Sequence, residues 1–379
     1  MSQPNNYGFE EEAGMLKDSA RRLFTQALPV DRLHALVAAD YDPERAPAPA
    51  WDPGLWTQMV ELGWTSLAVP ESAGGLAMPW VAVAGLLEEA GRAAVPAPLL
   101  TTLQTTAVLA RAGNGAAPAL EEICAGRAAT LVCQDGSGAV TATAVRAEAG
   151  KLYGEAHFVQ EAPRCDRLLV LASGEGGSGL YWVDRASAGV TLQSDPIVDL
   201  TRDQARVRFD GVDAQCVSED ADRVWAAAEP ALWTLASADM VGAAEWQLQT
   251  TVEYARQRQQ FDRPLGFFQA VKHQLVDVMI AIDESKSLLY SAACALDHEP
   301  ERARQLAHMA KASASETAGF ASGRSVQCHG GIGFTWECYV QLYFKRQEHS
   351  RRLWGDAAWH RARLAELLID RRDDARVAA

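Results

Sequence analysis

The junction around residue 260 carries side chains that could bind a phosphate group. Arg258 and Gln269 lie on either side of a run that contains Pro264 and Gly266, two residue types that interrupt helices. The run predicts that one helix ends near Arg258 and the next begins near Gln269. A guanidinium group beside a helix N-terminus suits a pyrophosphate, because both supply donors to phosphate oxygens. An arginine that only complements the negative end of a helix dipole is the alternative.

A second segment, Gln327–Phe334, ends another predicted helix. Its glycines, Gly330, Gly331 and Gly333, permit positive φ angles and close approach of a ligand to the backbone. A helix stop followed by an ordinary loop is the alternative. Because the segment does not follow a strand, it is not the glycine fingerprint of a Rossmann fold.

The cysteines predict neither a disulfide framework nor a metal centre. The chain has 7 of them, an odd number without paired spacing, which predicts reduced thiols in a cytoplasmic protein. Cys328 and His329 are adjacent, but no second pair lies at ligand spacing, so we expect no metal.

Charge and hydropathy exclude several classes of protein. The 379 residues include 35 Lys and Arg against 49 Asp and Glu, a formal net charge of −14. A protein that binds nucleic acid would need a basic surface, so we expect no nucleic-acid partner. The longest uncharged apolar run, Trp80–Leu87, is too short for a membrane span of about 20 residues. The first residues, Met1–Glu12, are polar and acidic and show no secretory signal.

The elements that must position these segments change in type along the chain. The first third predicts helices over Met15–Leu28, Leu55–Leu62 and Ala82–Ala93. After Gly126, short segments with β-branched residues and Gly- or Asp-bearing turns predict a compact β domain, a barrel or a sandwich. Its expected strands are Thr130–Cys133, Val140–Val145, Leu168–Leu171, Leu180–Val183, Val190–Leu192 and Arg206–Phe209.

Long helices return from about Val224. One follows an apolar stripe formed by Phe268, Val271, Leu275, Met279, Ile282 and Leu289. The others are predicted over Ala231–Gln257, Arg302–Val326 and Ala357–Ile369. Four such helices with short connections predict an antiparallel bundle. The expected fold is mostly α-helical with a central β domain: an N-terminal helical domain over 1–125, a β domain over 126–223 and a helical bundle over 224–379.

Several segments share motifs with one family. The junction is close to the pattern Arg-x-x-Phe-Gly-x-Pro-[Ile/Leu]-x-x-Phe-Gln, with Asp262 in place of the glycine, and Gln327–Phe334 matches Gln-x-x-Gly-Gly-x-Gly-[Phe/Tyr]. Further matching segments occur in the family's order, namely Leu62–Gly63, Val69–Glu71, Gly74–Leu76, Glu88–Arg92, Asp199–Arg202 and Phe209–Val212. On these motifs, which extend over nearly the whole chain, the sequence resembles the acyl-CoA dehydrogenase family.

The resemblance implies a flavoenzyme that uses FAD to desaturate an acyl thioester of coenzyme A. In that family a carboxylate base removes the α-proton, the β-hydrogen leaves as hydride to the flavin, and an electron-transfer flavoprotein accepts the electrons. FAD lies between the subunits of a tetramer. By the same resemblance, the diphosphate and adenosine half of a neighbouring subunit's FAD would be held by Arg258, Gln260, Phe261, Gln269, Gln327, Gly330 and Gly331.

The sequence departs from the family pattern where the flavin ring and the substrate would lie. The family's Thr-Glu-Pro-x-x-Gly-Ser loop corresponds to Val132–Gly138, which lacks the threonine and the proline. The Trp-Ile-[Thr/Ser] segment corresponds to Phe158–Gln160, and the Asp-x-x-Arg that contacts substrate is replaced by Pro230–Trp233.

The family's catalytic base is also missing from its usual place. Alignment of Gly355 with the Glu-Gly-[Thr/Ser] motif puts Trp354 at the glutamate position. Asp356 is the nearest acid and hence the catalytic candidate, although it also fits an N-cap for the helix that follows. The alternative base position of some members falls near Leu232. Glu229, close by, is interpreted as a first-turn acid that complements a helix dipole.

Three functional hypotheses follow. In the first, the chain resembles the base-lacking subunit of two-gene (α2β2) acyl-CoA dehydrogenases of bacterial steroid side-chain degradation and completes the FAD site of a catalytic homologue. In the second, it is a self-sufficient homotetramer with Asp356 or Glu229 as base. In the third, it is a flavin-free scaffold, against which the retained Arg258 and Gln269 argue. An acid–base group contributes roughly 10²–10⁴-fold to a rate, so its loss together with the flavin contacts favours the first hypothesis.

Overall fold

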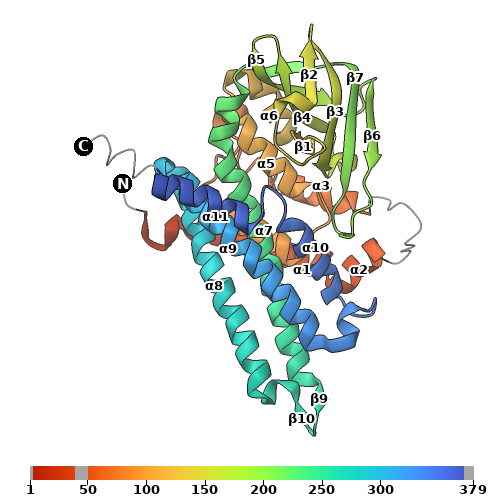
Figure 1. The fold of residues 1–379 in the computed structure, drawn as a ribbon, viewed down its shortest axis with the longest axis vertical. Coiled ribbons are helices and arrows are strands. Elements are labelled where there is room, and N and C mark those ends of the chain that lie inside the picture. The colour runs from red at the N-terminus through yellow and green to blue at the C-terminus, as the bar shows by residue number, and fades with distance from the viewer. Residues whose placement is uncertain (1–2, 39–49, 371–379) are drawn as a thin grey trace. The chain divides into compact units, whose positions relative to one another are not determined.

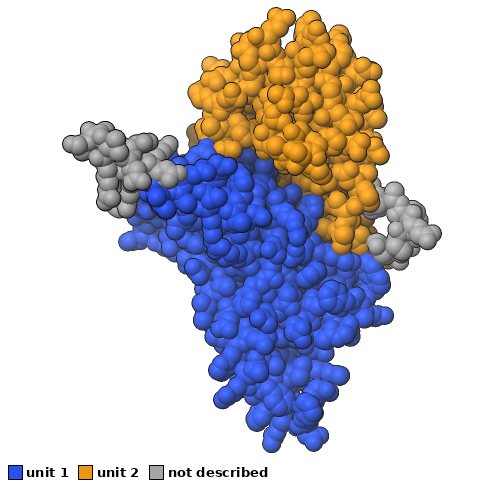
Figure 2. All heavy atoms as spheres, viewed as in Figure 1, with its two compact units in different colours: residues 1–35, 79–95, 230–379 blue, residues 36–78, 96–229 orange. Residues whose placement is uncertain are grey.

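The computed structural model describes residues 3–38 and 50–370. Along the chain, helices come first, strands follow and long helices come last (Figure 1). The chain forms two compact units, coloured separately in Figure 2: unit 1 comprises residues 1–35, 79–95 and 230–379, and unit 2 comprises residues 36–78 and 96–229. The mostly helical fold with a central β region is as predicted, while the domain boundaries proposed at 125/126 and 223/224 stay a prediction.

The first third of the chain contains more helices than its sequence predicts. They are α1 (Glu11–Ala27), α2 (Val30–Ala38), α3 (Pro53–Glu61), α4 (Trp80–Arg92), α5 (Leu99–Leu109) and α6 (Ala117–Cys124). The predicted helices correspond to α1, α3 and α4. Helix α5 was not predicted. All of its residues are buried, and a helix without a polar face shows no amphipathic period in its sequence.

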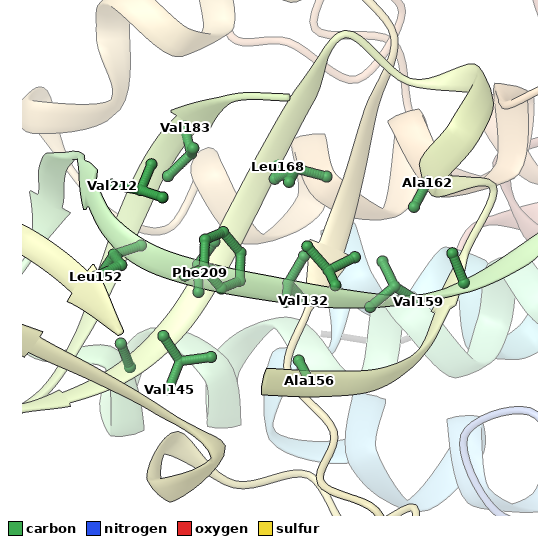
Figure 3. Close-up of a cluster of buried hydrophobic side chains, with 14 residues drawn as sticks. Val132, Val145, Leu152, Ala156, Val159, Ala162, Leu168, Val183, Phe209 and Val212 are labelled. Carbon is green, nitrogen blue, oxygen red and sulfur yellow. The ribbon is translucent and has the colours of Figure 1, made fainter. Parts of the chain in front are cut away.

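Unit 2 contains an eight-stranded sheet. Its strands are β1 (Ala129–Val132), β2 (Val145–Glu148), β3 (Lys151–Gln160), β4 (Arg167–Gly174), β5 (Gly177–Asp184), β6 (Val190–Ser194), β7 (Gln204–Asp213) and β8 (Gln215–Ser218). The order is β6-β7-β3-β2-β4-β5-β8, mostly antiparallel, with β1 parallel to β4. Apolar side chains from these strands converge on one core, as Figure 3 shows for Val132, Leu168 and Phe209.

The strand predicted over Val140–Val145 is wrong except at its last residue. The hydroxyl of Thr141 accepts a hydrogen bond from the Thr143 amide (3.1 Å) and starts a short 3-10 turn, so β2 begins only at Val145. Strand β3 was not predicted, because a bulge between Ala156 and Val159 breaks its alternation.

The C-terminal helices are α7 (Ala221–Gln257), α8 (Gln269–His298), α9 (Pro300–His329), α10 (Val340–Ser350) and α11 (Ala357–Ala365). Helix α7 begins earlier than predicted and continues through Pro230. Glu229 therefore lies inside this helix, which corrects its interpretation as a first-turn acid. Helix α10 was not predicted. The helix predicted over Ala357–Ile369 is present as α11, which a π-helical turn over Glu366–Asp370 continues.

The apolar stripe predicted on α8 divides into buried and exposed parts. Ile282 packs with Ala244 of α7 and Ala321 of α9, together with Val278, which was not part of the predicted stripe. Leu289 is fully buried. Met279, by contrast, is 45% exposed. The bundle thus uses only part of the stripe, and the rest of this face of α8 remains uncovered in the single chain.

Within unit 1, helices α4 and α7 cross at backbone contact. A Cβ atom added at Gly91 would lie 2.1 Å from the Asp239 carbonyl oxygen, and one added at Gly242 would lie 1.7 Å from that of Glu88. Only glycine permits so close an approach. The crossing buries Glu88 and Glu89 of α4.

No helix in residues 3–38 or 50–370 is long and apolar enough to cross a membrane. The same residues contain no cluster of three or more His, Cys, Asp and Glu side chains that could hold a metal ion. All 7 cysteines are free thiols.

Candidate functional site

The junction predicted to bind phosphate is a hairpin at the joined ends of α7 and α8 (Figure 1). Strands β9 (Gln259–Gln260) and β10 (Arg263–Pro264) pair in an antiparallel ladder. The two turn residues, Phe261 and Asp262, both have positive φ (54° and 56°), as a tight hairpin turn requires. Asp262 can replace the family's glycine here because aspartate tolerates the left-handed region better than most residues.

The side chains expected to hold the dinucleotide are open to solvent. Arg258, Gln260 and Gln269 are exposed, and Phe261 is 86% exposed. Within the described residues, the side chains of Arg258 and Gln269 make no hydrogen bond or ion pair, and Gln260 bonds only the neighbouring Gln259 carbonyl (2.9 Å). These groups are therefore available to something outside this chain.

The glycine segment closes α9 and also leaves open space. Helix α9 ends at His329, and Gly330 follows with φ 65°. A Cβ atom added at Gly330 or Gly331 would meet nothing within 4 Å, and Gln327 is exposed. The packing of this chain does not require glycine at 331, so the space beside it is free for a ligand.

Two aromatic side chains tie the hairpin to the glycine segment. The ring of Tyr254, one turn before Arg258, stacks on the ring of His329 at 4.2 Å, and the hydroxyls of Thr251 and Ser325 lie 2.8 Å apart. The structure thus brings together the two motifs that the sequence keeps separate. Sequence analysis missed Tyr254 and His329, although each lies within four residues of a predicted site residue.

We call the joined region, Arg258–Gln269 with Gln327–Gly331, the dinucleotide end. A phosphate group suits it for two reasons besides the guanidinium of Arg258. Phe268 at the N-cap of α8 offers no side-chain acceptor, so the start of this helix is not capped by a side chain and can face an anion. The open backbone at Gly330 and Gly331 admits a flat or bulky group. The residues present fit the phosphate and adenosine half of FAD.

The position of the missing base is a turn between α10 and α11, spanning Arg351–Asp356. Trp354 and Gly355 both have positive φ (61° and 94°). Asp356 is the N-cap of α11, where its carboxylate accepts a hydrogen bond from the Trp359 amide (2.8 Å). The structure therefore shows Asp356 in the capping role, and the turn holds Trp354, which the sequence analysis expects at the glutamate position of the motif.

A buried lysine holds this α10–α11 turn from α9. Lys311 is fully buried, and its ammonium group donates to the carbonyl oxygens of Gly355 (2.9 Å) and Arg351 (3.3 Å). A third hydrogen bond goes to the Ser315 hydroxyl (2.9 Å). Burial lowers the pKa of Lys311 to about 7. The lysine thus supplies hydrogen-bond donors to the carbonyl-rich end of α10, and the charge of Asp356 opposes part of the effect of burial on its pKa.

A histidine pair completes the support of the turn. Nε2 of His360 donates to the Trp354 carbonyl (3.0 Å), and its Nδ1 lies 2.8 Å from Nδ1 of His308. Because a carbonyl only accepts, we assign Nε2–H to His360 and Nδ1–H to His308. Burial lowers the pKa of His360 to about 3 and that of His308 to about 4, so both rings are neutral near pH 7.

An aromatic side chain replaces the family's substrate-contacting arginine beside this pair. Trp233 of α7 contacts His308 in a tilted arrangement with ring centroids 4.2 Å apart, and it contacts His360 edge-on at 5.2 Å. Leu232, near the alternative base position, is fully buried. Neither position offers a carboxylate, and Trp233 contributes packing to the histidine pair.

In unit 2, the loop that corresponds to the family's flavin loop is closed on itself. The carboxylate of Asp135 accepts hydrogen bonds from the Ser137 hydroxyl (2.6 Å) and amide (2.8 Å) and from the Ala139 amide (3.1 Å). The Gln134 amide donates to the Gly138 carbonyl (2.9 Å). The hydrogen bonds from Ser137 hold the pKa of Asp135 below its ordinary value. The polar groups of this loop are thus occupied locally.

The Phe158–Gln160 segment begins within the bulge of β3, which lies between Ala156 and Val159. Phe158 has a positive φ of 55°, a strained conformation for an aromatic residue, and its side chain is partly exposed. Gln160 donates to the Phe158 carbonyl (2.9 Å) and to the Gln204 side chain (2.8 Å), so it too is engaged within unit 2.

Comparison with known proteins matches these features to one family. Residues 10–139 match the model of the acyl-CoA dehydrogenase N-terminal domain and residues 234–369 that of the C-terminal domain. The chain is 32% identical over 345 residues, 90% of its length and 93% of the relative's, to the acyl-CoA dehydrogenase IpdE2 of Mycobacterium tuberculosis.

Solved structures share the fold over almost the whole chain. A variant of the Tcur3481-Tcur3483 steroid ACAD has a TM-score of 0.84 and 29% identity, covering 95% of this chain and 98% of that one. The ChsE4-ChsE5 complex of Mycobacterium tuberculosis has a TM-score of 0.83 at 24% identity, covering 96% of this chain and 99% of that one, which supports the fold alone.

Proposed function

The chain belongs to the acyl-CoA dehydrogenase family, and from this premise we propose that it is the partner subunit of a heterotetramer. In this proposal it completes the FAD site of a catalytic homologue and supplies no base of its own. The observation that carries the proposal is the α10–α11 turn, where Trp354 replaces the glutamate and buried side chains fix the surrounding backbone.

The dinucleotide end supplies the second half of the proposal. FAD, when bound, supplies the acceptor for the hydride that leaves the substrate's β-carbon. Arg258 and Gln269 would bind its phosphates, and Gln327, Gly330 and Gly331 would border its adenosine half, with Gln260 and Phe261 at the hairpin. Charge-assisted hydrogen bonds from an unpaired guanidinium are the strongest contacts available here.

The relatives support a steroid or other bulky acyl-CoA as the substrate class. One relative is described as a steroid ACAD, and that description joins two names, Tcur3481 and Tcur3483. Transferred to this chain, these descriptions favour a two-gene enzyme acting on a large thioester. An electron-transfer flavoprotein is the electron acceptor that the family implies.

An uncovered face on α8 suits a homologous subunit. Val276, Met279 and Ile280 are 46%, 45% and 56% exposed, and their spacing places them on one side of the helix. Phe267, just before the start of α8, is also exposed. Apolar surface of this kind on a monomer is typical of a protein–protein interface.

The test is co-expression with a homologue that carries the intact flavin loop and the Glu-Gly motif. We expect the two chains to co-purify as a yellow complex, and this chain by itself to be colourless. A yellow single chain would instead support the self-sufficient homotetramer with Asp356 or Glu229 as base. A colourless complex would support the flavin-free scaffold.

A further inference from the structure

A pocket of about 390 Å³ lies in unit 1, away from the α10–α11 turn in sequence and in lining. It is formed by α1, the start of α2, the end of α4, α7 and α10, and is lined by Arg21, Phe24, Thr25, Leu28, Pro29, Val30, Glu89, Arg92, Ala93, Trp246, Gln249 and Tyr343. This volume is within the range of small-molecule sites.

The charges behind the pocket do not balance. The buried carboxylate of Glu88 contacts Lys17 (2.7 Å) and Lys286 (2.8 Å), and Glu245 contacts Lys286 (2.6 Å). Burial alone would raise the pKa of Glu88, but the two lysines hold it below its ordinary value. The two carboxylates in turn overcome the effect of burial on Lys286 and raise its pKa to about 12. These groups therefore stay charged at neutral pH.

The remaining members of the network lie at the pocket itself. Arg21 forms a two-pronged contact with Glu89 (2.7 and 3.1 Å), which leaves Arg21 well paired. Arg92 approaches Glu89 only at 3.7 Å and Glu245 only at 4.0 Å. The network thus sets the four cations Lys17, Arg21, Arg92 and Lys286 against the three carboxylates Glu88, Glu89 and Glu245. One positive charge remains in excess.

Arg92 carries that excess charge. Its terminal nitrogens both donate to the neutral Gln249 side chain (2.7 and 2.9 Å), and its Nε is buried without a hydrogen-bond partner. A buried donor on a cation is costly to leave unsatisfied. An anion in the pocket, which Arg92 lines, would balance the charge of the network.

Apart from Thr25, the rest of the lining is apolar or aromatic. Trp246 and Tyr343 are stacked with centroids 3.7 Å apart and nearly parallel planes, and the Tyr343 hydroxyl donates to the Arg92 carbonyl (2.7 Å), so this wall is rigid. Phe24 and Leu28 form the buried part of the α1 wall. A ligand would therefore need one acidic group and a compact apolar body.

We propose that this pocket binds a small organic monocarboxylate with an aromatic or alicyclic body, its carboxylate on Arg92 and its ring among Phe24, Leu28 and Trp246. The site is separate from the dinucleotide end, and the proposal does not depend on the function proposed above.

The test is calorimetric titration of the full-length chain with 1-naphthoate and with its neutral analogue 1-naphthamide. We expect naphthoate to bind with one-to-one stoichiometry and naphthamide to bind at least about 10-fold more weakly, because a hydrogen bond to a charged group is lost. The Arg92→Met variant should weaken the binding of naphthoate about 10- to 100-fold. Arg22→Met changes an exposed arginine of α1 that does not line the pocket, and it should have no effect.

A second variant keeps the test decisive if Arg92→Met does not fold. Thr25 is exposed at the pocket, so Thr25→Trp should fill the space without removing a charge and should abolish naphthoate binding. Thr57→Trp, at an exposed position of α3, is the matched control and should bind normally. Absence of binding to the unmodified chain, or binding that Thr25→Trp leaves unchanged, would overturn the proposal.

Discussion

The dinucleotide end and the α10–α11 turn both rest on α7 and α9, yet they treat their polar groups in opposite ways. At the dinucleotide end, Arg258 and Gln269 are exposed and unpaired within the described chain. At the turn, the carbonyls of Arg351, Trp354 and Gly355 all accept hydrogen bonds from buried side chains. The first region is built to meet something outside the chain, whereas the second is built to hold its own backbone.

This contrast explains how one chain can keep part of a cofactor site while lacking its chemistry. The turn is fixed by Lys311 and His360, and its acid, Asp356, caps α11. Exposed donors at the other end cost the chain little, since water satisfies them until a ligand arrives. In the proposed function, a companion supplies the base, and the dinucleotide end of this chain stays usable by that neighbour.

The largest expected effect concerns the histidine pair, and it would show how firmly the turn is fixed. His308 and His360 have folded pKa values of about 4 and about 3, below the ordinary 6.5. As the pH falls, the unfolded chain therefore binds protons at these two histidines before the folded chain does. The neutral rings contribute their full stabilisation above pH 6.5, and this contribution is lost on acidification. For each histidine, the free energy of unfolding should fall by up to about 1.4 kcal/mol per pH unit below 6.5.

Urea unfolding between pH 7 and about pH 4.5 measures this loss. In His360→Gln, whose amide can still donate to the Trp354 carbonyl, the fall in unfolding free energy should be smaller than in the unmodified chain by up to about 3 kcal/mol. His298→Gln, an exposed histidine of α8, should keep the original slope. Equal slopes for all three proteins would mean that the pair does not fix the turn.

The next effect concerns the dinucleotide end. Replacing Arg258 and Gln269 together by alanine should weaken flavin retention in the complex by roughly 10²-fold, because charge-assisted hydrogen bonds contribute about 1.5–3 kcal/mol each. The fraction of flavin that stays with the complex after gel filtration measures this retention. The matched double variant Arg22→Ala/Gln26→Ala on α1 changes the same residue types at exposed positions and should keep its flavin; equal loss in both would refute the assigned role.

Part of this contrast could be predicted from the sequence and part could not. The ends of α7 and α9, and hence Arg258, Gln269 and Gly330, follow from Pro264, Gly266 and the glycine run, because these residues act locally. The pairing of Lys311 with the Gly355 carbonyl joins residues 44 apart, and no local pattern encodes it. Helix α5 and the bulged strand β3 were missed for a related reason: burial and bulging remove the periodicity on which such predictions rest.

A smaller effect is expected at Asp356. Asp356→Ala should lower the unfolding free energy by about 1 kcal/mol, because α11 loses its N-cap. Turnover by the complex should not change, since this carboxylate caps a helix in the structure. Thermal unfolding and a dehydrogenation assay on the same sample separate the two roles, and abolished turnover in a folded variant would return Asp356 to the position of base.

The smallest effect on stability is expected at Gly331. Gly331→Ala adds a methyl group into open space at a residue without positive φ, so the unfolding free energy should change by less than about 0.5 kcal/mol. Flavin retention by the complex should nevertheless fall, because the methyl group occupies the proposed ligand space. A variant that retains flavin as well as the unmodified complex would remove Gly331 from the dinucleotide end.

The central claim is that this chain works only with a companion that carries the base, and turnover of an acyl-CoA thioester tests it most directly. The assay compares the chain purified alone, the co-purified complex, and the complex in which the companion's motif glutamate is changed to glutamine. The account predicts turnover only in the unmodified complex. Turnover by the chain alone, or by the complex without the companion's glutamate, would contradict it.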